Sequence, residues 1–128
     1  MMDTPTYNVL VVEDDKINAF IVNRFLSDKY SVEVAQNGQE ALELISSNKF
    51  DAVLLDINLG DDELDGVEVL KRIRKFENYS CVPIIATTAY ALAGDRENFI
   101  SSGFDDYLSK PIKREELLEK LKLKLQSQ

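Results

Sequence analysis

Short apolar runs alternate with amphipathic segments along the whole chain. The runs Val9–Val12, Val53–Leu55 and Val82–Ala86 are continuous and rich in β-branched residues, which is typical of strands covered on both faces. The run Ser31–Ala35 alternates apolar and polar residues instead, which predicts a strand near the edge of a sheet. Phe104–Leu108 is the fifth candidate strand.

Between these runs the apolar residues recur with the period of a helix. The stripes are Ile17, Phe20, Ile21 and Phe25; Ala41, Leu42 and Ile45; Val69, Ile73 and Phe76; and Leu117, Leu118, Leu121 and Leu125. Asn37 and Glu40 have the spacing of a capping box at one helix start, and Asp65 with Glu68 has it at another. The segment Ala91–Ser102 is the remaining predicted helix.

Five strands that alternate with five helices predict an α/β fold with a parallel sheet and right-handed crossovers. A chain of 128 residues is too short for an eight-stranded barrel. We therefore expect a doubly wound five-stranded sheet with helices on both faces. It would form a single domain over residues 1–128, with a core of about residues 7–125. In such sheets functional groups gather at the carboxyl ends of the strands.

Composition excludes several classes of function. The chain has 15 Lys and Arg against 23 Asp and Glu, a net charge of −8, which disfavours direct binding to nucleic acids or to membranes. It has no His, which excludes Ser-His-Asp and Cys-His catalysis and most transition-metal sites. The single cysteine, Cys81, cannot form an internal disulfide, and the start of the chain lacks the pattern of a secretory signal. These features predict a cytoplasmic protein.

Polar side chains stand where four of the predicted strands end. They are Glu13, Asp14, Asp56, Thr88 and Lys110. Because the carboxyl ends of parallel strands meet at one edge of the sheet, we expect them to line one cleft. Oxygen ligands without His or Cys suit a hard cation, and Mg²⁺ is the usual one inside cells. The alternatives are that each acid only caps the following helix and that the lysine is an ordinary surface residue.

Other phosphate chemistry fits the sequence less well. No GxxxxGK[ST] or GxGxxG motif is present to cradle a nucleotide or flavin phosphate. A small aspartyl-phosphate phosphatase with Asp56 as nucleophile stays open as an alternative. That chemistry generally needs a proton donor two residues later, and Asn58 cannot serve as one.

At these positions the sequence resembles a response-regulator receiver domain, the phosphoacceptor module of two-component signalling. The resemblance covers Asn8 to Leu125 and rests on Glu13-Asp14, Asp56, Thr88-Ala89 and Lys110-Pro111 in this order. The segments that begin at Thr88 and at Gly103 are similar to receivers of hybrid sensor histidine kinases. The resemblance implies a flavodoxin-like sheet with the strand order 2-1-3-4-5.

The resemblance also implies how phosphorylation would occur. Asp56 would accept a phosphoryl group from a histidine kinase or a histidine phosphotransfer protein, so the chain would be a signalling phosphoacceptor and not an enzyme acting on a separate substrate. Asp14, Asp56 and the main-chain carbonyl of Asn58 would bind Mg²⁺ directly, while Glu13 would act through water. Lys110, aimed by a cis bond to the following proline, would bind the phosphoryl oxygens.

The response to phosphorylation is implied in the same way. Thr88 would hydrogen-bond the phosphorylated aspartate, and Tyr107 would follow it inward. This movement would reshape the face formed by helix 4, strand 5 and helix 5, to which a downstream effector would bind. Tyr90 would cover the phosphoryl group and slow its hydrolysis. A pseudo-receiver that binds partners without being phosphorylated remains a third reading.

Overall fold

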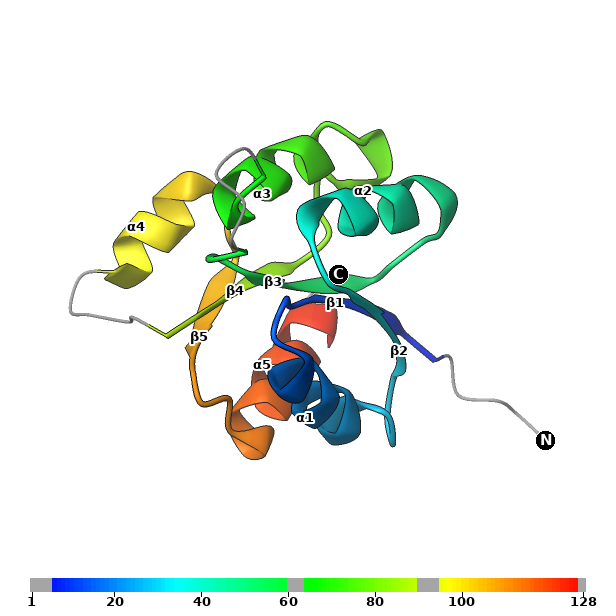
Figure 1. Cartoon of the computed structure of the whole chain (residues 1–128), viewed down its shortest axis with the longest axis vertical. Helices are drawn as coiled ribbons and strands as arrows, with labels where there is room; N and C mark the ends of the chain where they lie inside the picture. The colour runs from blue at the N-terminus through cyan, green and yellow to red at the C-terminus, as the bar shows by residue number, and fades with distance from the viewer. Residues whose placement is uncertain (1–5, 60–63, 90–94, 127–128) are drawn as a thin grey trace.

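The computed structural model of the chain describes residues 6–59, 64–89 and 95–126, and its centre is a five-stranded sheet (Figure 1). The strands are β1 (Asn8–Val12), β2 (Ser31–Ala35), β3 (Ala52–Asp56), β4 (Ile84–Thr88) and β5 (Asp106–Ser109). They lie in the order β2-β1-β3-β4-β5, and every neighbouring pair is parallel. The predicted fold class and strand order are therefore confirmed.

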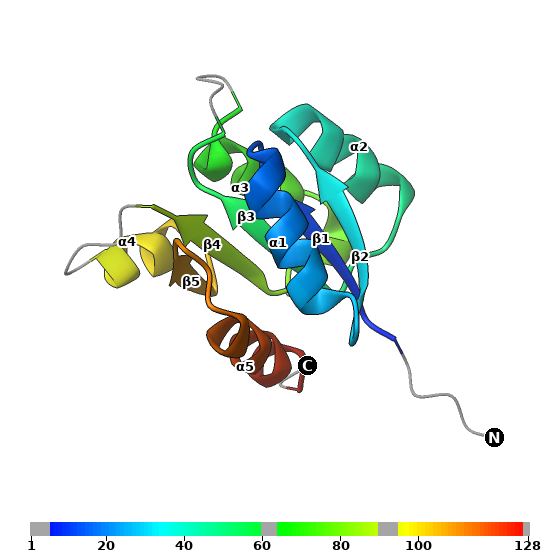
Figure 2. The same ribbon diagram turned by 60° about the horizontal axis from the view of Figure 1, so that its bottom comes forward.

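Helices cover both faces of this sheet. They are α1 (Lys16–Leu26), α2 (Gly38–Ser47), α3 (Gly66–Arg74), α4 (Asp95–Ser102) and α5 (Arg114–Gln126), with a 3₁₀ turn, η1, at Glu77–Tyr79. Figure 1 shows α2, α3 and α4 on one face, with α1 and α5 on the other. Figure 2 turns this second face forward and shows α1 and α5 lying across it.

The two layers of helices enclose two apolar cores, one on each face of the sheet. Successive residues of a strand point to opposite faces, so Leu10 and Val12 join the core under α2 and α3. Val9 and Val11 join the core under α1 and α5. The strands that form the middle of the sheet are buried on both faces over most of their length, which explains why apolar residues follow one another in them until polar residues begin at the carboxyl ends of β3 and β4.

Helix α1 buries a different side from the one its most obvious apolar stripe suggests. The residues packed into the core are Ala19, Val22 and Leu26, which recur at helical spacing. Ile17 and Phe20, in contrast, are 72% and 63% exposed. The predicted stripe therefore locates the helix correctly but leaves an apolar surface facing solvent.

The predicted helix caps are confirmed. The side chain of Asn37 accepts a hydrogen bond from the Glu40 N–H at 2.8 Å, and that of Asp65 accepts one from the Glu68 N–H at 2.9 Å. The predicted start of α4 at residue 91 lies outside the described residues, which show the helix from Asp95.

Two of the strands begin two residues later than predicted. Strand β4 begins at Ile84 and not at residue 82, and β5 begins at Asp106 and not at Phe104. Phe104 is apolar because it fills the core after Gly103, whose φ of 113° turns the chain there. Its ring also packs edge-on against Phe99 of α4. Phe104 was therefore predicted to belong to a strand because it is apolar, although it is buried in the turn that precedes β5.

Arg74, the last residue of α3, forms hydrogen bonds with the segments that precede β4 and β5. Its guanidinium donates hydrogen bonds to the main-chain oxygens of Tyr79 (2.9 Å), Val82 (2.6 Å) and Gly103 (3.1 Å) and to Oδ2 of Asp105 (2.8 Å). These segments enter the sheet at the edge opposite the carboxyl ends of the strands. The arginine therefore stabilises the fold at a distance from the acidic residues.

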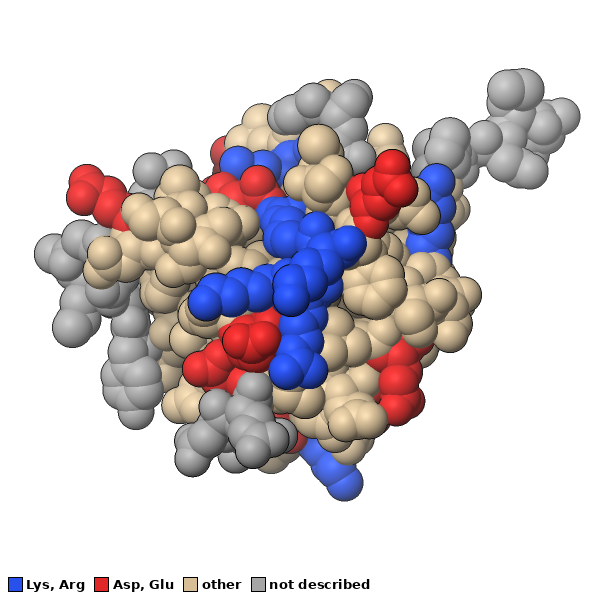
Figure 3. Space-filling view, turned by 90° about the horizontal axis from the view of Figure 1, so that it is seen from above, with Lys and Arg blue, Asp and Glu red and all other residues tan. Residues whose placement is uncertain are grey.

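The negative charge of the chain is unevenly distributed over its surface. Figure 3, which views the molecule from the side of α2 and α3, shows a band of Lys and Arg across this face. The last turn of α3 supplies Lys71, Arg72 and Arg74. Cations at this end of a helix interact favourably with its dipole, so the band has a local structural reason.

Candidate functional site

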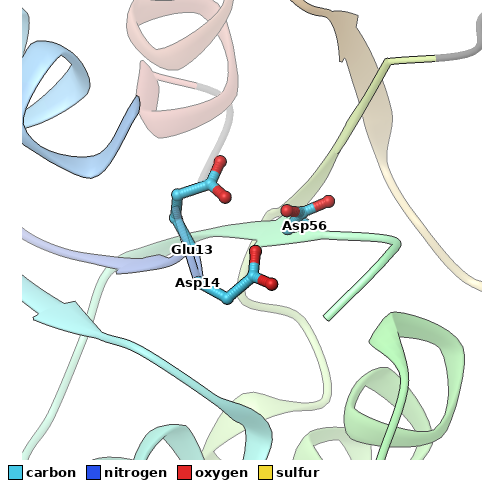
Figure 4. Close-up of side chains that lie close together, drawn as sticks. All are labelled: Glu13, Asp14 and Asp56. Atoms are coloured by element: carbon cyan, nitrogen blue, oxygen red, sulfur yellow. The ribbon is translucent and has the colours of Figure 1, made fainter. Parts of the chain in front are cut away.

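Three carboxylates meet at the carboxyl ends of β1 and β3 (Figure 4). Glu13 and Asp14 directly follow β1, and Asp56 is the last residue of β3. The register that pairs Val12 with Leu55 brings these positions side by side. One oxygen from each carboxylate lies within 4.8 Å of those of the other two. We call these three residues, together with Lys110, the acidic site.

Lys110 reaches the acidic site from the segment after β5. Its Nζ lies 2.8 Å from Oε1 of Glu13 and 2.9 Å from Oδ2 of Asp56. The peptide bond to Pro111 is cis, as the sequence suggested, and the Lys110 N–H donates to the Thr88 carbonyl at 2.7 Å. The ammonium therefore lies between two of the three carboxylates.

Asp56 is held from two sides. Its Oδ1 accepts a hydrogen bond from the Asn58 N–H at 3.0 Å, and its Oδ2 accepts the one from Lys110. The residue is 2% exposed, whereas Asp14 and Asn58 are open to solvent. The orientation of the Asp56 carboxylate is thus fixed while the site remains accessible beside it.

Glu13 is the second buried acid of the site. It is 4% exposed, and its Oε2 accepts the Asp15 N–H at 3.1 Å. Burial raises the pKa of Glu13 to about 7; the hydrogen bond from Lys110 opposes this rise, and the neighbouring Asp56 adds to it. Burial alone would lower the pKa of Lys110, but its hydrogen bonds and charge interactions with Glu13 and Asp56 together raise it. The lysine therefore stays protonated wherever the carboxylates are ionised.

The third acid of the run, Asp15, has a structural role. Its Oδ1 accepts hydrogen bonds from the N–H groups of Ile17 (2.8 Å) and Asn18 (3.2 Å) and so caps α1. The helix-cap reading thus applies to Asp15, while Glu13 and Asp14 belong to the acidic site.

The predicted switch residues lie beside the site on β4 and β5. Thr88 is the last residue of β4 and is 6% exposed. Tyr107 is half-buried, with its ring 5.4 Å from that of Phe99 in α4. The Nζ of Lys120 in α5 lies 5.1 Å from the centre of the same ring and donates to the Tyr107 carbonyl at 2.6 Å. Tyr107 thus contacts both helices that flank β5. Tyr90 lies outside the described residues.

Gly66, the first residue of α3, is a feature that the sequence argument missed. A Cβ at this position would lie 2.4 Å from the Asp56 carbonyl oxygen and 2.6 Å from the Ile57 Cα. The Gly66 N–H also donates to the Ile57 carbonyl at 2.9 Å. Only a residue without a side chain allows α3 to begin so close to the main chain of Asp56. In the sequence, the only indication of this close approach was a glycine directly after the helix cap Asp65.

The donor set fits a hard divalent cation. Three carboxylates supply oxygen ligands, and no nitrogen or sulfur ligand stands in the cluster. Three carboxyl groups stand against the single ammonium of Lys110, so the site has an excess of acidic groups that a divalent cation can balance. In the part of the chain that the structure describes, no helix combines the length and the apolar character needed to cross a membrane.

Comparison with known proteins gives consistent matches. The chain matches the family model of the response regulator receiver domain over residues 9–122. It is similar to response regulator MprA of Mycolicibacterium vanbaalenii, with 42% identity over 115 residues, which are 89% of this chain and 48% of that protein. It is also similar to the signal transduction histidine-protein kinase BarA of Escherichia coli K12, with 34% identity over 110 residues, 85% of this chain and 12% of that protein. The chain thus spans about half the length of MprA and a smaller share of BarA.

A solved structure gives the same result. The receiver domain of sensor histidine kinase PA1611 from Pseudomonas aeruginosa PAO1 superimposes with a TM-score of 0.84 and is 38% identical. The match covers 94% of this chain and 98% of that one. That structure is described with a magnesium ion coordinated in its active site cleft.

Proposed function

Because the chain belongs to the response regulator receiver domain family, we propose that it is a phosphoacceptor of two-component signalling. Asp56 takes a phosphoryl group from a phosphohistidine of a histidine kinase or a histidine phosphotransfer protein, and the phosphorylated chain regulates a downstream partner. The observation that supports this most directly is the Lys110 ammonium, 2.9 Å from Oδ2 of Asp56 in the acidic site.

The side chains of the site suit this transfer. A carboxylate oxygen of Asp56 attacks phosphorus, the new P–O bond forms as the P–N bond breaks, and the imidazole leaves with the electrons of that bond. The N–H of Asn58 and the ammonium of Lys110 hold the attacking carboxylate in place. Once the acyl phosphate has formed, Lys110 neutralises charge on the phosphoryl oxygens.

The acidic site also suits Mg²⁺. Asp14 and Asp56, with the main-chain carbonyl of Asn58, would hold the ion, which when bound supplies further positive charge to the phosphoryl oxygens. Calorimetric titration with Mg²⁺ tests this assignment, because the chain has no Trp to report binding by fluorescence. Asp14→Ala should weaken binding at least tenfold, and an unchanged titration would refute the assignment.

The exposed apolar residues of α1 beside the acidic site favour a protein as the phosphodonor. Ile17, Phe20 and Ile21 expose 72%, 63% and 40% of their surface on α1, whose capping residue directly follows Asp14. Apolar side chains grouped beside a reactive site are typical of a protein interface. Phe20→Ser should therefore slow transfer from a phosphorylated histidine protein and leave phosphorylation by acetyl phosphate unchanged. The free thiol of Cys81 is exposed, which fits the reducing cytoplasm where such kinases act.

The output surface would be the one around Tyr107. A phosphoryl group adds about −1.5 to −2 charges beside Thr88. Movement of Thr88 toward this group makes room for Tyr107, which now packs between Phe99 of α4 and Lys120 of α5. The face of α4, β5 and α5 would change its shape in response and bind the effector differently.

Phosphate labelling tests the proposal. Wild type and the surface control Asp28→Ala should become labelled when incubated with labelled acetyl phosphate and Mg²⁺, and Asp56→Ala should not. Labelling of Asp56→Ala at another carboxylate would show that the acceptor is misassigned. Absence of label on wild type would favour a pseudo-receiver, and sustained release of phosphate from an added phosphomonoester would favour a phosphatase.

A further inference from the structure

The carboxyl-terminal end of α3 presents two lysines to solvent. Lys71 and Lys75 are both exposed, and their spacing of four residues places them on one face of the helix. Among the residues that the structure describes, neither ammonium forms an ion pair, whereas the nearby Arg72 pairs with Glu68. They stand at the helix end that contributes to the band of Lys and Arg in Figure 3. Both charges are therefore available to a partner.

An exposed aromatic ring adjoins these lysines. Phe76 directly follows Lys75 and exposes 37% of its surface, whereas Tyr79, which its ring meets edge-on, is buried. The helix dipole explains why cations gather at this end of α3, but it does not explain an aromatic side chain left in solvent beside them. Aromatic side chains are enriched at protein interfaces. We call Lys71, Lys75 and Phe76 the α3 crest.

We propose that the α3 crest is a docking surface for an acidic segment of a partner protein. The two ammonium groups, one helical turn apart, pair with two carboxylates of that segment, and Phe76 packs against an apolar side chain between or beside them. The contact is additional to those proposed at α1 and around Tyr107.

The charges around the α3 crest favour a short acidic segment over a long polyanion. The chain carries a net charge of −8, so positive potential is confined to this band. Glu77 follows the crest, and Glu43 lines the groove between α2 and α3 together with Arg72. A nucleic acid has a charge at every phosphate and would extend over these acids, whereas a peptide can limit its carboxylates to the crest.

The position of the α3 crest separates it from phosphorylation. Helix α3 begins against the main chain of Asp56, and the crest lies at its other end. There the four hydrogen bonds of Arg74 hold the helix to the segments before β4 and β5. Figure 1 places α3 and α1 on opposite faces of the sheet. A partner bound at the crest therefore leaves α1 open to the phosphodonor and stays bound whatever the state of Asp56.

Two synthetic peptides test the proposal with the full chain. The acidic probe is fluorescein-labelled EELAEELAEE, and the neutral probe is QQLAQQLAQQ, which keeps the same leucines. Fluorescence anisotropy at low salt should show at least about tenfold tighter binding of the acidic probe, and added salt should weaken it. In the ¹⁵N-labelled chain, the acidic probe should shift the amide signals of residues 71–76.

Substitutions in the α3 crest then assign the contact. Lys71→Gln combined with Lys75→Gln should weaken binding of the acidic probe at least about fivefold, and Phe76→Ser should weaken it about threefold. The matched control is Lys29→Gln combined with Lys122→Gln, which removes the same charge from exposed lysines outside α3 and should change the dissociation constant less than about twofold. Asp56→Ala should bind as wild type does.

Several outcomes would overturn the proposal. Equal weakening by the two lysine pairs would show that only the total charge matters, and unchanged binding in Phe76→Ser would show that the ring is no anchor. Tighter binding of a single-stranded oligonucleotide than of the acidic probe would make the crest a nucleic-acid surface. Sedimentation of wild type as a dimer that Lys71→Gln with Lys75→Gln dissociates would make the occupant a second copy of the chain. No phosphodonor is present, so these results do not depend on whether Asp56 accepts phosphate.

Discussion

The two arginines near the end of α3 allow a matched test of what stabilises the fold. Arg74 donates four hydrogen bonds, to the main chain of η1 and of the segments before β4 and β5, and to Asp105. Among the described residues, the side chain of Arg72, two residues earlier, makes one ion pair, with Glu68 at 3.1 Å on the same helix. Replacing each arginine by methionine removes the same charge and keeps a similar aliphatic stem.

The two replacements should differ several-fold in cost. Hydrogen bonds to charged groups contribute about 1.5–3 kcal/mol each when they are fully protected. The side chains of Arg74 and Asp105 are 22% and 39% exposed, so water replaces part of what is lost. We therefore expect Arg74→Met to lower the free energy of unfolding by about 3 kcal/mol. Arg72→Met should lower it by less than about 0.5 kcal/mol, because both members of its pair are exposed.

Urea unfolding followed by far-ultraviolet circular dichroism measures both values. The expected loss for Arg74→Met corresponds to a fall of roughly 1 to 2 M in the midpoint, for the slopes usual in domains of this size. The Mg²⁺ affinity of the folded variant should not change, because Arg74 lies at the other end of the strands from the acidic site. Equal losses for the two variants, or a loss below about 1 kcal/mol for Arg74→Met, would refute the reasoning.

Three further predictions concern the acidic site. The raised pKa of Glu13 means that the folded state holds an extra proton between pH 4.5 and about 7, so the residue destabilises the fold as the pH rises through this window. We therefore expect the free energy of unfolding of Glu13→Gln, measured in chelating buffer relative to that of wild type, to rise by about 3 kcal/mol between pH 4.5 and about 7. Gly66→Ala should lower stability by about 1–3 kcal/mol and slow phosphorylation of Asp56, because its Cβ would overlap the Asp56 main chain. Thr88→Ala should still accept phosphate but shift the amide signals around Tyr107 less than wild type does.

Each of these predictions has a contradicting outcome. A stability difference between Glu13→Gln and wild type that stays constant with pH would show that Glu13 titrates normally. Gly103 is the reference for Gly66, because a Cβ there would meet only the Leu70 side chain, at 3.3 Å, and its cost would come from its φ of 113°. Gly103→Ala should therefore lower stability while leaving phosphorylation of the folded protein unchanged. If both variants slowed the phosphorylation of Asp56 equally, the close approach of Gly66 to Asp56 would not be the cause. Full amide shifts around Tyr107 in phosphorylated Thr88→Ala would show that the threonine does not transmit the change.

The fold could be predicted because its layers impose a simple pattern on the sequence. A strand such as β3, buried on both faces, is apolar up to Asp56 at its carboxyl end, and β2 at the edge alternates Val32 and Val34 with an exposed Glu33. The side of α1 that packs on the sheet could not be predicted in this way. Hydrophobicity alone favours Ile17 and Phe20, whereas the space between helix and sheet admits the smaller set that begins with Ala19.

The position of the acidic site followed from the rule that parallel strands end at one edge, but its internal pairing did not. The distance between Glu13 and Lys110 depends on how two segments 97 residues apart are placed and on the length of one side chain. The close approach of Gly66 to Asp56 is likewise a tertiary contact, and its local sequence shows only a helix cap followed by a glycine. Sequence patterns identify which residues can reach an edge, and packing decides which of them touch.

The main-chain hydrogen bond from Lys110 to the Thr88 carbonyl, 2.7 Å long, has a consequence for mutational scans of this chain. It couples the main chain at the end of β4 to that of the lysine segment, so a substitution that shifts the main chain at one of these residues also shifts it at the other. Contributions of residues that share such a contact are not additive. The effects of paired substitutions at positions 88 and 110 should therefore show strong epistasis. A scan of single substitutions would therefore attribute to Thr88 and Lys110 separately an effect that comes from the contact they share.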